Sequence, residues 1–222
     1  MGYIYLSHYI NSHSPTYGNR NKFINEIKSS ISDGDTCNEN SWSLTTNHIG
    51  THVDFPNHFY DNGFTLSEYK PKDFIFNKVY LIEAFCDKAK LLSENDLNLK
   101  NIPINTDFLI IKTNYGKHRG KSIYWDQYPS FSYKLIKKLK NKFKLKAIGF
   151  DLISLTSPLY KSDGKKSHKI LLSPKYSQQT IIVEDMNLEK VTGDTIIKNV
   201  IIAPLLVEKA NGSPVTIIAD TN

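Results

Sequence analysis

The feature that most constrains the fold is a buried strand, an amphipathic helix and a second buried strand that follow one another in the chain. Residues 107–113 contain the apolar run Phe108-Leu109-Ile110-Ile111, which is typical of a strand buried on both faces. Residues 131–144 carry an apolar side chain at every fourth position, which predicts an amphipathic helix: Phe131, Leu135, Leu139 and Phe143. Residues 147–150 are again apolar. This order predicts a right-handed crossover between two parallel strands.

Further strands are predicted on both sides of this unit, because runs rich in β-branched and aromatic residues recur along the chain. They cover residues 3–7, 41–47, 76–85, 180–183, 196–203 and 215–219, and residues 166–172 form a short predicted helix. Residues 19–40 are polar with a weak pattern, which fits either a hairpin or an irregular excursion. No repeat or linker divides the 222 residues. We therefore expect one α/β domain over residues 1–222, with a mixed sheet.

The net charge of +6 raises the question of a nucleic-acid partner. Lysines concentrate around the helix at 131–144, opposite its apolar stripe, where a solvated helix face explains them, and no nucleic-acid-binding module is recognisable. No run approaches the ~18 apolar residues of a membrane span, and the first residues lack the pattern of a signal peptide. The sequence predicts a cytoplasmic protein that binds neither nucleic acid nor a membrane.

One short segment differs sharply from the rest of the chain, because three of the seven histidines fall within eleven residues, together with an aspartate. These residues are His48, His52, Asp54 and His58. Imidazole and carboxylate are ligands that Zn²⁺ and Mn²⁺ accept. The pattern therefore predicts a site for a divalent metal, and the alternative is an exposed polar loop with three unrelated histidines.

A shared metal requires the backbone to bend within this segment. A straight strand would separate His48 from Asp54 by about 20 Å, at roughly 3.3 Å per residue. A regular helix is weakened by Gly50 and ended by Pro56. Glycine is the residue that most readily permits a sharp turn, so we expect the bend at Gly50.

The segment resembles the HxGTHxDxPxH signature of the cyclase family that includes bacterial kynurenine formamidase; it reads HIGTHVDFPNH over residues 48–58. Other family elements resemble further segments in the same order along nearly the whole chain. These are LSH at 6–8, LIIKTNYG at 109–116, AIGFD at 147–151, HKILL at 168–172, IVEDMNL at 182–188 and GSPV at 212–215.

The resemblance implies a three-layer β/β/α swivelling-type fold and a site with two divalent cations per subunit, or one, of zinc or manganese. By position, the family's ligands fall on His48, His52 and Asp54 for the first ion, with Asp54 bridging to a second. His168 and Glu184 would complete the second site, and His58 would be the catalytic acid–base. Spacing alone could not have joined His168 or Glu184 to the cluster.

Two residues are expected to contact substrate. The family often places an aromatic ring near the substrate at the position of Tyr17, although a packed loop tyrosine is an equal alternative there. Phe55 stands where the family usually has a small residue, so the substrate space beside the metals is expected to differ. Asp185 follows Glu184 where the family has asparagine, which adds a competing carboxylate next to a ligand.

The function that these implications favour is hydrolysis of an amide C–N bond in a small molecule, with an aryl formamide such as N-formylkynurenine as the substrate. Water bound to the metal would attack the carbonyl carbon, and His58 would transfer the proton. The alternatives are a hydrolase that opens a cyclic amide or lactone, as isatin hydrolases do, and an inactive metal-binding interaction protein. The family commonly forms dimers or tetramers, so we expect a homo-oligomer.

Overall fold

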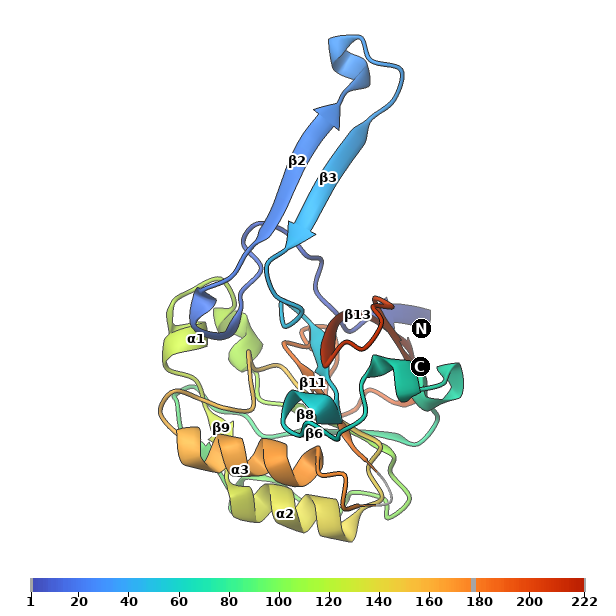
Figure 1. Ribbon diagram of the computed structural model, residues 1–222. Coiled ribbons are helices and arrows are strands. Elements are labelled where there is room, and N and C mark those ends of the chain that lie inside the picture. Colours follow the sequence, from blue (N-terminus) through green and yellow to red (C-terminus); the bar gives the residue numbers. More distant parts are fainter. Residues whose placement is uncertain (1, 177–178, 222) are drawn as a thin grey trace.

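The computed structural model describes residues 2–176 and 179–221, and it shows three layers with a long arm. Helices α2 (Tyr133–Lys142) and α3 (Lys161–Leu171) lie side by side at the bottom of the view in Figure 1 and cover one face of the central sheet. A second β layer packs against the other face. This is the mixed α/β, three-layer β/β/α fold that the sequence and its resemblance predicted.

One nine-stranded sheet supplies both β layers, in the order β5-β12-β13-β4-β11-β10-β8-β6, with β1 also paired to β13. Strands β6, β8, β10 and β11 run parallel, whereas β4 is antiparallel to both of its neighbours. The bounds are β1 Gly2–Tyr5, β4 His52–Asp54, β5 Ile75–Phe76, β6 Val79–Glu83, β8 Phe108–Lys112, β10 Ala147–Phe150, β11 Ile181–Glu184, β12 Ile197–Pro204 and β13 Gly212–Thr221. The short strands β7 (Leu91–Leu92) and β9 (Ser130–Phe131) form a separate pair.

The alternation of side chains along β8 explains why the described residues form a hydrophobic core on each face of this strand. Successive residues of a strand point to opposite faces of a sheet. Phe108 and Ile110 therefore belong to the core between the β layers, whereas Leu109 and Ile111 belong to the core beneath the helices. All four side chains are fully buried. The uninterrupted apolar run in the sequence thus reflects burial on both faces, as predicted.

The helices differ from prediction at their ends. Phe131 belongs to β9, and α2 begins only after Ser132, whose side chain accepts a hydrogen bond from the Leu135 N–H. Helix α3 begins at Lys161, five residues before the predicted start. A Cβ at Gly164 would lie 2.5 Å from the Cα of Thr156, so this glycine lets the first turns of the helix approach Thr156 closely. A third, short helix, α1, spans Ile123–Asp126. In the described part of the chain, seven 3₁₀ turns lie at Tyr17–Asn19, Ile31–Asp33, Pro56–His58, Leu66–Glu68, Pro71–Phe74, Glu94–Asp96 and Tyr115–His118.

The polar segment at 19–40 contributes to a two-stranded hairpin, β2 (Phe23–Ser29) with β3 (Glu39–Leu44), which extends from the body as an arm in Figure 1. This is the first of the two structures that the sequence allowed. The register places Phe23, Ile27, Trp42 and Leu44 on one face of the hairpin. Ile27 is 74% exposed and Trp42 is 59% exposed, so this apolar face is uncovered in the single chain.

None of the helices in the described part of the chain is both long enough and apolar enough to cross a lipid bilayer.

Candidate metal centre

The histidine-rich segment bends where the sequence predicted. Gly50 adopts a φ of 57°, a left-handed conformation that glycine reaches without steric cost. His48 therefore lies before the turn, and β4 carries His52 and Asp54 after it. The rings of His48 and His52 come to 5.4 Å between centroids. The bend thus brings together two imidazoles and a carboxylate from one short stretch of chain.

The strand register adds a second carboxylate to this group. His52 pairs with Glu184 of β11, so the two side chains lie on the same face of the sheet, which is the helical face. On the other side of β4, Gly212 pairs with Asp54. A Cβ atom at Gly212 would lie 2.4 Å from Nε2 of His48, so the absence of a side chain there makes room for the imidazole.

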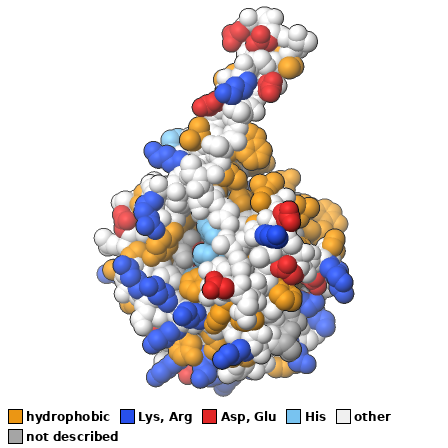
Figure 2. All heavy atoms as spheres, in the orientation of Figure 1, with side chains coloured by type: hydrophobic (Ala, Val, Ile, Leu, Met, Phe, Trp, Pro, Cys, Tyr) orange, Lys and Arg blue, Asp and Glu red, His pale blue; other side chains and the backbone are white. Residues whose placement is uncertain are grey.

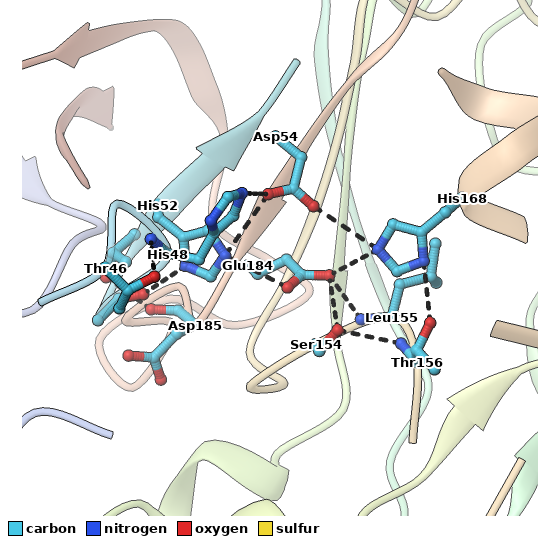
Figure 3. A network of polar contacts seen from close by, with 12 residues as sticks. Thr46, His48, His52, Asp54, Ser154, Leu155, Thr156, His168, Glu184 and Asp185 are labelled. Carbon is cyan, nitrogen blue, oxygen red and sulfur yellow. Dashed lines mark hydrogen bonds and ion pairs between the residues drawn. The ribbon is translucent and has the colours of Figure 1, made fainter. Parts of the chain in front are cut away.

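Helix α3 contributes the last donor. His168 is buried on the face of α3 that packs toward the sheet, and its Nε2 atom lies 3.6 Å from Oδ2 of Asp54 and 3.4 Å from Oε1 of Glu184. Figure 3 shows His168 pointing at these two carboxylates from the side opposite His48 and His52. The structure therefore brings together the five residues that the family resemblance named as ligands.

The spacing of the donor atoms suits a metal ion. Nε2 of His48 lies 3.3 Å from Oδ1 of Asp54, and Nε2 of His52 lies 3.6 Å from the same oxygen. Nε2 of His52 is also 3.4 Å from Oε2 of Glu184. Two ligands at about 2.1 Å from one zinc ion in tetrahedral geometry lie about 3.4 Å apart. Donors gathered around a cation would therefore have the separations that are observed.

Two polar atoms at the centre of the cluster have no hydrogen-bond partner, although both are buried: Nε2 of His48 and Oδ1 of Asp54. A buried polar atom without a partner costs about 1–3 kcal/mol. Among the described residues, two groups could each hold a cation and share Asp54, namely His48–Asp54–His58 and His52–Asp54–Glu184. The donor set fits one or two divalent cations, and it is compatible with zinc and manganese alike.

Hydrogen bonds behind the cluster fix the direction of the histidine donors. Nδ1 of His52 is 2.8 Å from the carbonyl oxygen of Gly50, and Nδ1 of His168 is 3.0 Å from the carbonyl oxygen of Gly164. The Thr156 hydroxyl also lies 3.0 Å from Nδ1 of His168. An Nδ1–H that donates to a carbonyl leaves Nε2 as a lone-pair donor directed into the cluster.

Glu184 is oriented from another direction. Its Oε1 atom accepts hydrogen bonds from the Leu155 N–H at 2.6 Å and from the Ser154 hydroxyl at 3.2 Å. Both donors lie in the segment that follows β10. These two hydrogen bonds hold Oε1, so that the other carboxylate oxygen, Oε2, faces His52.

The electrostatics of the metal-free cluster favour protonated histidines between ionised carboxylates. Burial lowers the pKa of His52, but the neighbouring Glu184 and Asp54 carboxylates outweigh it and raise the pKa to about 9. Burial and the same two carboxylates act on His168 in the same way, with a pKa of about 9. Burial raises the pKa of Asp54, yet the adjacent His168 and His48 hold it well below its usual range. Protons therefore occupy positions that a metal would compete for.

His58 lies at the edge of the cluster. It belongs to the 3₁₀ turn Pro56–His58, its ring centroid is 4.3 Å from that of His48, and burial lowers its pKa below the ordinary value of 6.5. A neutral imidazole next to the donors can accept a proton at neutral pH. The grouping of His58 with His48 and Asp54 also allows it to act as a ligand.

A cavity of about 350 Å³ opens onto these residues. Its wall includes Tyr17, whose contact with a substrate stays a prediction, together with Arg20 and Lys165, which the sequence reading did not single out. Figure 2 shows histidine atoms exposed near the middle of this face, below the hairpin. The donor cluster is therefore accessible to a small molecule.

Phe55 does not line this cavity, which corrects the expectation that it shapes the substrate space. It is fully buried in the core between the β layers, where its ring packs 5.0 Å from that of Tyr69. Side chains alternate along β4, so the residue after Asp54 points away from the metal face.

Asp185 does not compete as a ligand. Its carboxylate points away from the cluster in Figure 3 and accepts hydrogen bonds from Arg119 and Tyr124 instead. Arg119 and Tyr124, which hold Asp185, and Thr156, which lies beside His168, are functional residues that the sequence motifs do not mark. No local spacing links these residues to the histidine segment, so only the fold reveals them.

Comparison with known protein families identifies the family of this chain. The family model described as "Putative cyclase" matches residues 4–156, which is more than half of the sequence. The chain belongs to this cyclase family. The match includes the histidine-rich segment and ends before His168 and Glu184. No curated protein sequence matches the chain.

Solved structures share the fold of this cyclase-family chain at low sequence identity. An isatin hydrolase bound to the product analogue thioisatinate is 20% identical, with a TM-score of 0.79 over 98% of this chain and 91% of that one. Isatin hydrolase A from Labrenzia aggregata is 18% identical, with a TM-score of 0.77 over 98% and 93% of the two chains. A predicted metal-dependent hydrolase from Bacillus stearothermophilus is 17% identical, with a TM-score of 0.76 over 98% of this chain and 97% of that one.

Proposed function

We propose that this cyclase-family chain is a metal-dependent hydrolase of an amide C–N bond. The observation that carries the proposal is the convergence of His48, His52, Asp54, His168 and Glu184, with donor atoms 3.3–3.6 Å apart, at a cavity of about 350 Å³. These residues would hold one or two Zn²⁺ or Mn²⁺ ions. A divalent cation bound there would supply a water with a pKa of about 7 and would polarise a carbonyl oxygen.

His58 is assigned the proton transfer. It would take a proton from the attacking water and return it to the departing nitrogen, so that water is added across the C–N bond and an acid and an amine leave. Its lowered pKa keeps the imidazole free to accept that proton at neutral pH. Tyr17, on the wall of the same cavity, would pack against an aromatic substrate.

An aryl formamide such as N-formylkynurenine is the substrate that we propose, because an aniline leaves more readily than an alkyl amine and the cavity wall carries an aromatic ring. A cyclic amide is the second candidate. The similarity of the fold to isatin hydrolases favours it, since both reactions need the same donors and differ in the shape of the pocket.

An assay of zinc-loaded and manganese-loaded protein against N-formylkynurenine, isatin and simple lactones tests the proposal. We expect hydrolysis of the formamide, and we expect His52→Ala to lower both metal content and turnover. His13→Ala is the matched control, because His13 is exposed and lies outside the cavity at the cluster. Faster hydrolysis of isatin would favour the second candidate. Inactivity on every substrate with tight metal binding would show a metal-binding protein rather than an enzyme.

A further inference from the structure

Asp185 is a fully buried acidic residue that the proposed reaction does not use. It follows Glu184 directly, and its backbone is left-handed, with a φ of 53°. This conformation is uncommon outside glycine, although Asp and Asn adopt it more easily than other residues. The turn directs the Glu184 carboxylate into the donor cluster and the Asp185 carboxylate away from it (Figure 3). The conformation of this turn therefore contributes to the direction of Glu184, whose Oε1 atom is also held by Leu155 and Ser154.

The Asp185 carboxylate is held by two side chains from outside β11. Nε of Arg119 donates to both carboxylate oxygens at 3.0 Å, and Nη2 of Arg119 lies 2.9 Å from Oδ2. The Tyr124 hydroxyl donates to Oδ1 at 2.5 Å. A buried carboxylate that accepts from a guanidinium N–H and from a hydroxyl has little freedom to rotate. The side chain of Asp185 therefore anchors its own backbone.

The backbone of Asp185 is tied on both sides as well. Its N–H donates to the carbonyl oxygen of Leu152 at 2.7 Å, and its carbonyl oxygen accepts from the Thr51 hydroxyl at 2.6 Å. Thr51 stands immediately before His52, within the bend that carries the first donors. The Thr51 hydroxyl also accepts from the His8 N–H at 2.9 Å. One residue thus connects the segment that carries His52 with the segment that carries Glu184.

We propose that Asp185, held by Arg119 and Tyr124 and linked to Thr51, is a positioning residue of the metal centre. It helps to set the separation of Glu184 from His52. It touches neither substrate nor metal. The inference rests on the proposed metal site. It adds that the affinity of the site for metal depends on an ion pair just beyond the C-terminal end of β11.

The proposal is tested by measuring the zinc affinity of the protein in competition with a chelator of known affinity. We expect Asp185→Ala and Arg119→Met to weaken zinc binding about 10- to 100-fold, the range found when residues that orient metal ligands are removed. Asp185→Asn should weaken it less, because Asn tolerates the left-handed turn and keeps polar contacts. Lys117→Met is the control, since it removes an ion pair with Asp87 from the same loop without touching Asp185. Wild-type affinity in a folded Asp185→Ala protein would overturn the proposal.

A second pair of variants covers the case in which the loss of a buried ion pair prevents folding. Thr51→Val removes the hydroxyl at nearly constant size, whereas Thr51→Ser keeps it. We expect Thr51→Val to weaken zinc binding and Thr51→Ser to restore it. Equal zinc affinity in the two variants would contradict the positioning role.

A crystal structure of the metal-free Thr51→Val protein separates this inference from the proposed function. We expect Oε2 of Glu184 to move away from its position 3.4 Å from Nε2 of His52. An unchanged separation would overturn the positioning role, even if the wild-type protein binds zinc. A wild-type protein that binds no metal would overturn the proposed function, while the metal-free structure would still decide whether Asp185 positions Glu184.

Discussion

Nε2 of His168 lies 3.6 Å from Oδ2 of Asp54, although the two residues come from distant parts of the sequence and from different layers of the fold. The contact joins a helix to the strand that follows the Gly50 bend. It explains why the donor cluster forms only in the folded chain, and why metal binding and folding should be coupled.

The variant His58→Ala tests whether His58 transfers protons or binds the metal. We expect the variant to keep its metal and to lose about 10²- to 10⁴-fold in kcat, the usual contribution of a general acid–base. Elemental analysis and steady-state kinetics on the same preparation measure both quantities. Parallel loss of metal would show that His58 is a ligand, as its grouping with His48 and Asp54 allows.

The metal-free protein should lose stability as the pH rises from about 6.5 to about 8. The pKa values of His52 and His168 are raised from 6.5 in the unfolded chain to about 9 in the folded protein. Their contribution to the free energy of unfolding is therefore complete below pH 6.5 and falls as the pH rises toward about 9. Burial lowers the pKa of Lys140 to about 8. Loss of its proton therefore raises the stability of the folded protein, but only above about pH 8, outside this window. Melting temperatures of chelator-treated protein across this window measure the effect.

The variant His52→Gln provides the comparison for this pH dependence. We expect a smaller fall in melting temperature between pH 6.5 and 8 than in the wild-type protein. Identical profiles for the two proteins would contradict the assigned coupling between His52 and its carboxylates.

Gly212→Ala should weaken metal binding without any change to a donor. The added Cβ would lie 2.4 Å from Nε2 of His48, so the imidazole must move. We expect the zinc dissociation constant to rise about 10- to 100-fold, as for other changes that misdirect a ligand. Gly2→Ala is a matched control, because a Cβ there meets nothing within 4 Å. Unchanged affinity in a folded Gly212→Ala protein would show that His48 is not a ligand.

The homo-oligomer expected from the family resemblance is still a prediction, and the hairpin offers a way to test it. An isolated two-stranded hairpin is marginally stable in water, and this one exposes Ile27 and Trp42 on one face. We expect light scattering to show a dimer or tetramer that Ile27→Ser with Trp42→Ser shifts toward monomer. Ile24→Ser, on the opposite face, is the control. A monomeric wild-type protein would contradict the prediction.

Much of the fold and of the site could be predicted where the signal is local. The apolar run at 108–111 and the four-residue spacing of the following helix are short-range patterns, and both elements formed. The bend at Gly50 could be predicted because three donors had to meet within a few residues. Helix α3 was predicted too short, since its first turn is polar and is stabilised by contacts with the rest of the fold.

Long-range contacts set the limit of the sequence reading. His168 and Glu184 could be assigned to the cluster only through the family resemblance. No sequence spacing predicts the contact between Arg119 and Asp185. The error at Phe55 was avoidable. His52 and Asp54 share one face of a strand, so the alternating residues had to point into the opposite core.

The measurement that tests the central claim most directly is an anomalous-difference map from crystals of zinc-loaded protein, recorded on both sides of the zinc absorption edge. The account predicts one or two peaks at bonding distance from Nε2 of His52 and the carboxylates of Asp54 and Glu184, and their loss in His52→Ala crystals. A fully loaded protein whose zinc lies elsewhere, with these side chains free of metal, would contradict it.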